Sequence, residues 1–148
     1  MRGISGGAGA LARVKTARAW LAIAVVLATT GCGRRDPITF AAVEGTVTVA
    51  GRPLSASEAE IIFMPDAARG TKGPISVGAI KAGGTYVLIG PGGRRGAIVG
   101  HHKVFLAVPD AGGAIPQRFQ AAATSPLSAE VRPVGMNALD FNCEKEVP

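Results

Sequence analysis

The stretch VEGTVTVAGRPLSASEAEIIFMP, from Val43 to Pro65, decides the fold because its first part alternates between apolar and polar residues. Side chains of an extended chain point in turn to its two faces. One face carries Val43, Gly45, Val47 and Val49, and the other carries Glu44, Thr46 and Thr48. Pro53 marks a turn, and the apolar run from Ala59 to Pro65 follows it. The stretch therefore predicts two β-strands joined by a turn.

Five further segments show the same short apolar pattern between turn residues. They are ISVGAI (75–80), TYVLI (85–89), GHHKVFLAVP (100–109), SAEVRPV (128–134) and NALDFNC (137–143). The glycine-rich GPGGRRGAIVG (90–100) is expected to be a flexible connection, and residues 110–126 a long loop. No segment after Cys32 has helical periodicity. The pattern of segments in this 148-residue sequence therefore predicts one all-β sandwich of seven strands.

The quoted stretch, followed by GAIKAGGTYVLIGPGG (78–93), resembles the carboxypeptidase regulatory-like, transthyretin-like domain. In that family a Gly-x-Val strand leads through a Gly-x-Pro-Leu turn to a strand that ends near Phe and Pro. A Gly-x-Tyr strand then follows an Asp-Gly-type turn, whose Asp is missing here at Ala82–Gly83–Gly84. The resemblance covers about Val43 to Phe141 and extends to small lipoproteins of planctomycete-like bacteria. It implies a Greek-key β-sandwich and, since its motifs are turns and strand ends, no particular activity.

The N-terminus has the pattern of an export signal. Residues 1–18 carry four basic residues and no acid, and the nine apolar residues from Trp20 to Ala28 follow them. A membrane-spanning helix needs about 20 apolar residues, so this run is too short to be one. A basic stretch before a short apolar core is typical of a cleaved signal peptide.

The segment LATTGC, from Leu27 to Cys32, resembles a bacterial lipoprotein signal. The resemblance implies cleavage after Gly31 and lipidation of the Cys32 thiol, although Thr29 departs from the usual Leu. An ordinary secretory cleavage beside an unrelated cysteine is the alternative. Gly33 lacks the Asp that retains lipoproteins in the inner membrane, which leaves the outer membrane or the periplasmic face of the envelope as the address. The expected parts are a signal peptide (1–31), a lipidated tether (32–42), a sandwich (43–143) and a tail (144–148).

The charge of the exported part excludes nucleic acid as an expected partner. The whole chain has a formal charge of +6, but four of its sixteen basic residues precede Cys32. The remaining twelve face ten acidic residues, which leaves a formal charge of +2. No run of basic residues persists, so the basic character belongs mainly to the leader.

Two adjacent histidines, His101 and His102, are the only ones in the chain and are the first candidates for a site. Neighbours on a strand point to opposite faces, so the two rings are expected to be apart rather than on one metal ion. The spacing of Cys143, Asp110 and Glu44 matches no zinc pattern. An entry into a strand is the favoured interpretation, and no metal or other cofactor is expected. An envelope hydrolase or metal-binding protein that uses these histidines is the alternative.

The other candidate is a binding surface at Arg118 and Phe119, in the IPQRF segment of the long loop. The competing interpretation is that Ile115 and Phe119 close one end of the sandwich while Arg118 faces water. No Gly-x-Ser-x-Gly elbow is present, and the chain ends FNCEKEVP instead of in the Tyr-Arg-Gly-Ser of transthyretin-like hydrolases. Cys143 is expected to be buried. The sequence thus predicts a non-catalytic, lipid-anchored envelope module whose partner is a protein or a carbohydrate.

Overall fold

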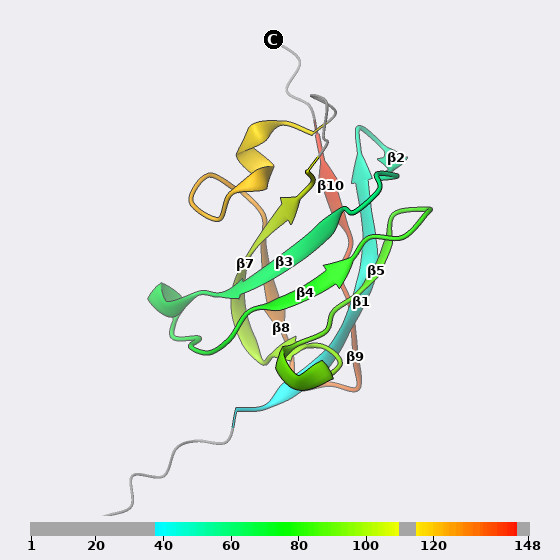
Figure 1. The fold of residues 1–148 in the computed structure, drawn as a ribbon. Helices are drawn as coiled ribbons and strands as arrows, with labels where there is room; N and C mark the ends of the chain where they lie inside the picture. Colours follow the sequence, from blue (N-terminus) through cyan, green and yellow to red (C-terminus); the bar gives the residue numbers. More distant parts are fainter. Residues whose placement is uncertain (1–37, 110–114, 145–148) are drawn as a thin grey trace, which may run out of the picture. The chain divides into compact units, whose positions relative to one another are not determined.

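The computed structural model describes residues 38–109 and 115–144, which form two β-sheets packed face to face (Figure 1). Residues 37–148 make one compact unit. The predicted signal peptide, the cleavage site at Gly31 and the lipidation site at Cys32 lie outside the described residues. None of the described helices is long and apolar enough to cross a membrane.

The first sheet is built around β1 (Phe40–Val49). The antiparallel strands β2 (Arg52–Pro53), β5 (Thr85–Val87) and β6 (Ala97–Ile98) line one side of it. Two parallel strands, β9 (Met136–Ala138) and β10 (Phe141–Cys143), line the other side. The last strands of the domain therefore lie beside its first.

The second sheet is antiparallel throughout, in the order β4–β3–β7–β8. Its strands are β3 (Glu60–Pro65), β4 (Ser76–Ala79), β7 (Gly100–Ala107) and β8 (Ser128–Val131). The inward side chains of both sheets meet in one core, which includes Val43, Val47, Ile61, Phe63, Tyr86, Leu88, Val104 and Leu106. These positions follow the alternation in the sequence, so the prediction of an all-β sandwich is confirmed.

The two long edges of the sandwich differ. At one edge β4 continues into β5, and Val77 and Ile89 exchange two backbone hydrogen bonds of 2.9 and 2.8 Å between N and O. At the other edge β8 of the second sheet faces β9 and β10 of the first, and no strand pairing joins them within the described residues. The first edge is closed by backbone and the second is open.

The prediction of seven strands is wrong, because residues 38–109 and 115–144 form ten. The turn at Ala50 and Gly51, both with positive φ, folds the chain back so that β2 pairs with the end of β1. The glycine-rich connection contains β6, which pairs with the start of β1. The expected last strand is split in two, because the backbone at Leu139 and Asp140 leaves the ladder. In addition, β1 begins at Phe40, three residues before the expected boundary.

Three short 3-10 helices lie in the connections between the described strands. They are η2 (Ala67–Arg69), η3 (Pro91–Gly93) and η4 (Gln117–Gln120). The last of them packs beside β7 and carries the buried ring of Phe119. It covers one end of the open edge and leaves the rest of that edge uncovered by the described elements (Figure 1).

Candidate functional site

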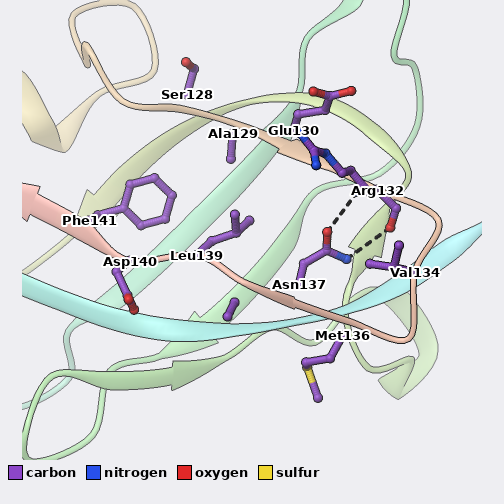
Figure 2. A pocket seen from close by; sticks show the side chains of 11 residues that line it. Ser128, Ala129, Glu130, Arg132, Val134, Met136, Asn137, Leu139, Asp140 and Phe141 are labelled. Atoms are coloured by element: carbon purple, nitrogen blue, oxygen red, sulfur yellow. Dashed lines mark hydrogen bonds between the residues drawn. The ribbon is translucent and has the colours of Figure 1, made fainter.

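The open edge holds a groove of about 650 Å³ between β8 and the β9–β10 segment. Figure 2 shows its lining, with Ser128, Ala129 and Glu130 on one wall and Leu139, Asp140 and Phe141 on the other. The turn between Arg132 and Met136 closes one end. Each wall is thus an edge strand from a different sheet, and we call this feature the edge groove.

The chemistry of the edge groove is mixed. Val134 and Met136 are 51% and 47% exposed at its closed end. Glu130, Arg132 and Asp140 add charges of both signs along its walls. Apolar side chains next to unpaired strand edges are typical of surfaces that accept another strand.

Asn137 holds the closed end of the groove together. Its side chain is only 7% exposed, and its Oδ1 accepts a hydrogen bond of 2.9 Å from the Arg132 N–H. Its Nδ2 donates to the carbonyls of Arg132, at 3.1 Å, and Ala42, at 3.2 Å. Figure 2 shows the two bonds to Arg132. One amide group thereby replaces the backbone ladder that is missing between β8 and the first sheet.

The break between β9 and β10 is fixed by side chains as well. The Leu139 carbonyl turns inward and accepts a hydrogen bond of 2.6 Å from the Tyr86 hydroxyl. Gly45 lies beneath this carbonyl, and a Cβ there would collide with the Leu139 oxygen. Burial, with the Asp140 carboxylate as a smaller cause, raises the pKa of Tyr86 above its usual range, so the phenol stays protonated and remains a donor.

Asp140 occupies the place that the displaced backbone vacates. Its Oδ1 accepts hydrogen bonds of 2.8 Å from both the N–H and the Oγ1 of Thr46 in β1. A carboxylate that accepts two bonds is held in one orientation. The β9–β10 wall of the edge groove is therefore fixed against β1 by Asn137 and Asp140, and against β5 by Tyr86.

The structure does not bring the two histidines together. His102 is 2% exposed, its ring lies 5.8 Å from that of Phe63, and its Nδ1 donates to the Gly100 carbonyl at 3.1 Å. Burial lowers the pKa of His102, against the smaller opposing effect of that hydrogen bond. His101 is on the other face, where its backbone N–H donates to Thr71 Oγ1. In residues 38–109 and 115–144, no three His, Cys, Asp or Glu side chains gather as metal ligands do.

The candidate surface at Arg118 and Phe119 is largely used within the domain. Phe119 and Ile115 are each 3% exposed and belong to the core. The Arg118 guanidinium lies 4.7 Å from the centroid of the Phe119 ring and donates to the Glu144 carbonyl at 2.8 Å. These contacts favour the interpretation in which the segment closes one end of the sandwich.

Cys143 is buried on β10 and is free of any disulfide. Burial raises the pKa of its thiol to about 11, although nearby Arg118 acts in the opposite direction. The thiol is therefore protonated at neutral pH and unsuited to nucleophilic chemistry.

Sequence reasoning missed the residues that shape the edge groove. Asn137 did carry a signal, because alternation puts it on the same face as Leu139, Phe141 and Cys143, and a buried amide needs partners. The inward turn of Leu139 had no such signal, since Tyr86 is 53 residues away. In comparisons with protein families, curated proteins and solved structures, no match to the chain is found.

Proposed function

We propose that this chain is a non-catalytic, lipid-anchored envelope protein whose β-sandwich binds an extended polypeptide segment in the edge groove. The observation that carries the proposal is the pair of edge strands that face each other across a groove of about 650 Å³, with no described strand between them. Edge strands present backbone donors and acceptors that another extended chain satisfies. The polypeptide interpretation is favoured over a carbohydrate because main-chain pairing needs no particular side chains.

The lining of the groove supports an extended ligand with alternating side chains. Successive side chains of a bound strand point to opposite sides. One set would contact Val134 and Met136, whose large exposed fractions mark them as available. Glu130 and Arg132 supply charges of opposite sign that would fix the direction of the ligand.

The anchor completes the proposal. Cleavage after Gly31 would leave lipidated Cys32 as the first residue, followed by a short polar tether to β1. Each buried acyl methylene contributes about 0.8 kcal/mol, so two or three chains hold a protein stably in a bilayer. The sequence resemblance supports a carboxypeptidase regulatory-like, transthyretin-like sandwich with Greek-key connections.

Selection of random peptides against the compact unit 37–148 tests the groove. Selected peptides should lose at least about tenfold in affinity for Val134→Asp and Met136→Asp, which place a charge in an apolar contact. The matched control is Ile75→Asp, because Ile75 is 48% exposed on another surface and should leave affinity unchanged. Equal binding to all three variants, or failure to select any peptide, would contradict the proposal.

The anchor has a separate test in the full chain. Cys32→Ala should abolish incorporation of labelled fatty acid and shift the protein from the membrane to the soluble fraction. Unchanged partitioning would refute lipidation and leave the groove proposal standing.

A further inference from the structure

One row across the outer face of the second sheet is apolar, although no described element covers that face (Figure 1). Ile89, Val77, Ile62 and Phe105 pair in register across neighbouring strands, so their side chains form one continuous row. They point away from the core, because the residues on either side of them in the chain, such as Ile61, Phe63 and Val104, are buried. We call these four residues the outer row.

Two more apolar side chains extend the outer row along the strands. Met64 lies two residues from Ile62 on β3, and Ile75 lies two residues from Val77 and is 48% exposed. Ile89, at the end of the row, is 42% exposed. Contiguous apolar surface of this kind on a folded domain marks an interaction site.

The first sheet shows how this same chain builds a face that meets water. Its outer positions from Glu44 to Thr48 on β1 are polar and are flanked by Thr85 and Asn142, whereas Val87 and Met136 are apolar residues of the same face. Thr46 Oγ1 donates to Asp140 Oδ1, and Thr48 Oγ1 donates to Asn142 Oδ1. The first sheet therefore mixes polar and apolar residues on its outer face, whereas one whole row of the second sheet is apolar.

The charges beside the outer row are arranged so that a second copy complements them. Exposed Glu60 lies two residues from Ile62 toward one side of the row, in register with Ala107. Exposed Lys103 lies two residues from Phe105 toward the other side, in register with Met64. Neither has an ion-pair partner among the residues that the structure describes.

We infer that the outer face of the second sheet binds the same face of a second copy, with a two-fold axis along the outer row. Rotation about this axis exchanges the two sides of the row. Glu60 of each copy then faces Lys103 of the other, because β3 and β7 are neighbours about 4.8 Å apart. The apolar rows pack against each other between the two charge pairs, as in aligned sheet packing.

The size of the face sets the strength of this dimer. The face is four strands wide, at about 4.8 Å per strand, and six residues long, at about 3.3 Å per residue. Its area is therefore roughly 400 Å² per copy. Stable interfaces bury about 800 Å² per partner. The dimer should therefore be weak and concentration-dependent. It uses the sheet face and leaves the edge groove free, so it does not rest on the proposed function.

Sedimentation equilibrium of the unit 37–148 tests the dimer. The mean mass should rise from monomer toward dimer between about 10 µM and 1 mM, the range expected of a small interface. Glu60→Lys and Lys103→Glu should each weaken association about fivefold, because each opposes like charges twice. The double variant should restore the association constant to within about twofold of that of the unchanged protein. Lys81→Glu, an exposed charge reversal in the β4–β5 turn, is the control and should change nothing.

Three outcomes would overturn the inference. The first is a monomer at about 1 mM, a concentration far above that of a specific weak dimer. The second is a double variant that associates no better than the single ones, which would show that Glu60 and Lys103 do not meet. The third is adsorption of monomers to phosphatidylglycerol vesicles that is lost in Ile62→Asp, which would make the face a lipid contact instead.

Discussion

The two sheets of the sandwich are connected differently at its two long edges. At the β4–β5 edge, Val77 and Ile89 join the sheets through backbone hydrogen bonds that any residue can make. At the β8–β10 edge, the Asn137 side chain bonds to Arg132 at the end of β8, Tyr86 and Asp140 fix the β9–β10 wall within its own sheet, and a groove remains. One edge is therefore specified by the path of the chain and the other by individual side chains.

This difference predicts which edge tolerates substitutions and which edge opens locally. Backbone pairing survives most substitutions, whereas a connection through a single amide or phenol is lost with that residue. The side-chain edge is also the one with few backbone bonds to break, so it is the region expected to open locally. The groove proposed to bind a peptide lies at this edge.

The largest effect is expected at Gly45, beneath the inward carbonyl of Leu139. In Gly45→Ala the new methyl group collides with that backbone oxygen, so unfolding should become easier by about 3 kcal/mol or more. Urea denaturation followed by circular dichroism measures the change. Gly135→Ala is the control, because a Cβ there meets nothing within 4 Å. Equal stability of the two variants would contradict the geometry of the break.

The second largest loss of stability is expected for Asn137→Leu. It removes the partners of three backbone groups, on Arg132 and Ala42, and should cost about 2–3 kcal/mol. Hydrogen exchange should quicken at Arg132 but stay unchanged at Val77 and Ile89. Asn142→Ala, at an exposed amide on the neighbouring strand, should cost about 0.5 kcal/mol or less. Faster exchange at both edges would abolish the distinction between them.

Tyr86→Phe should have a smaller effect, because only the hydroxyl bond to Leu139 is lost. About 1–1.5 kcal/mol is expected from leaving one carbonyl without its partner. Tyr86 is the only tyrosine in the chain, so absorbance titration of the native protein reports it alone. Its phenol should ionise above the range of a free tyrosine. Ionisation at the ordinary value would show that the ring is not buried.

Acid should loosen the side-chain edge selectively. His102 pairs with Ala129 of β8, and its folded-state pKa lies below that of the unfolded chain, which is about 6.5. The contribution of neutral His102 to the free energy of unfolding is then fully present above that pH. It falls as the pH drops toward the folded-state pKa, because the unfolded state binds the proton first. Exchange at β8 should increase over this window. His102→Gln should remove most of the dependence and His101→Gln should keep it; the reverse result would contradict the assignment.

The smallest effect is expected at the backbone edge. Ile89→Thr changes an exposed side chain and leaves both hydrogen bonds to Val77 in place. At dilute protein concentration its stability should change by about 0.5 kcal/mol or less. A loss as large as that of Asn137→Leu would show that the two edges depend on side chains alike.

Alternation in the sequence was sufficient to predict the layers of the sandwich. It placed Val43 and Val47 inward, and it separated His102 from His101. These features depend on local geometry, which a single strand already possesses. The core face of each long strand was therefore predictable.

The edges were not predictable, because they depend on partners that are distant in sequence. The two-residue strands β2 and β6 exist only because β1 offers them a ladder. The break at Leu139 exists because Gly45 and Tyr86 make room for an inward carbonyl and bind it. Of the groove residues, only Asn137 had a local signal, as an amide on an apolar face.

The pairing of β1 with β9 and β10 has a consequence for how the chain folds. Thr46 and Asp140 are 94 residues apart, so the first sheet closes a loop that contains nearly the whole domain. Contacts of such separation are slow to form, because the entropy of loop closure is lost before they contribute. The second sheet, whose strands are closer in sequence, can form first. Folding is then completed only after β10 has been synthesised and released, and one side of β1 stays unpaired until that strand is available.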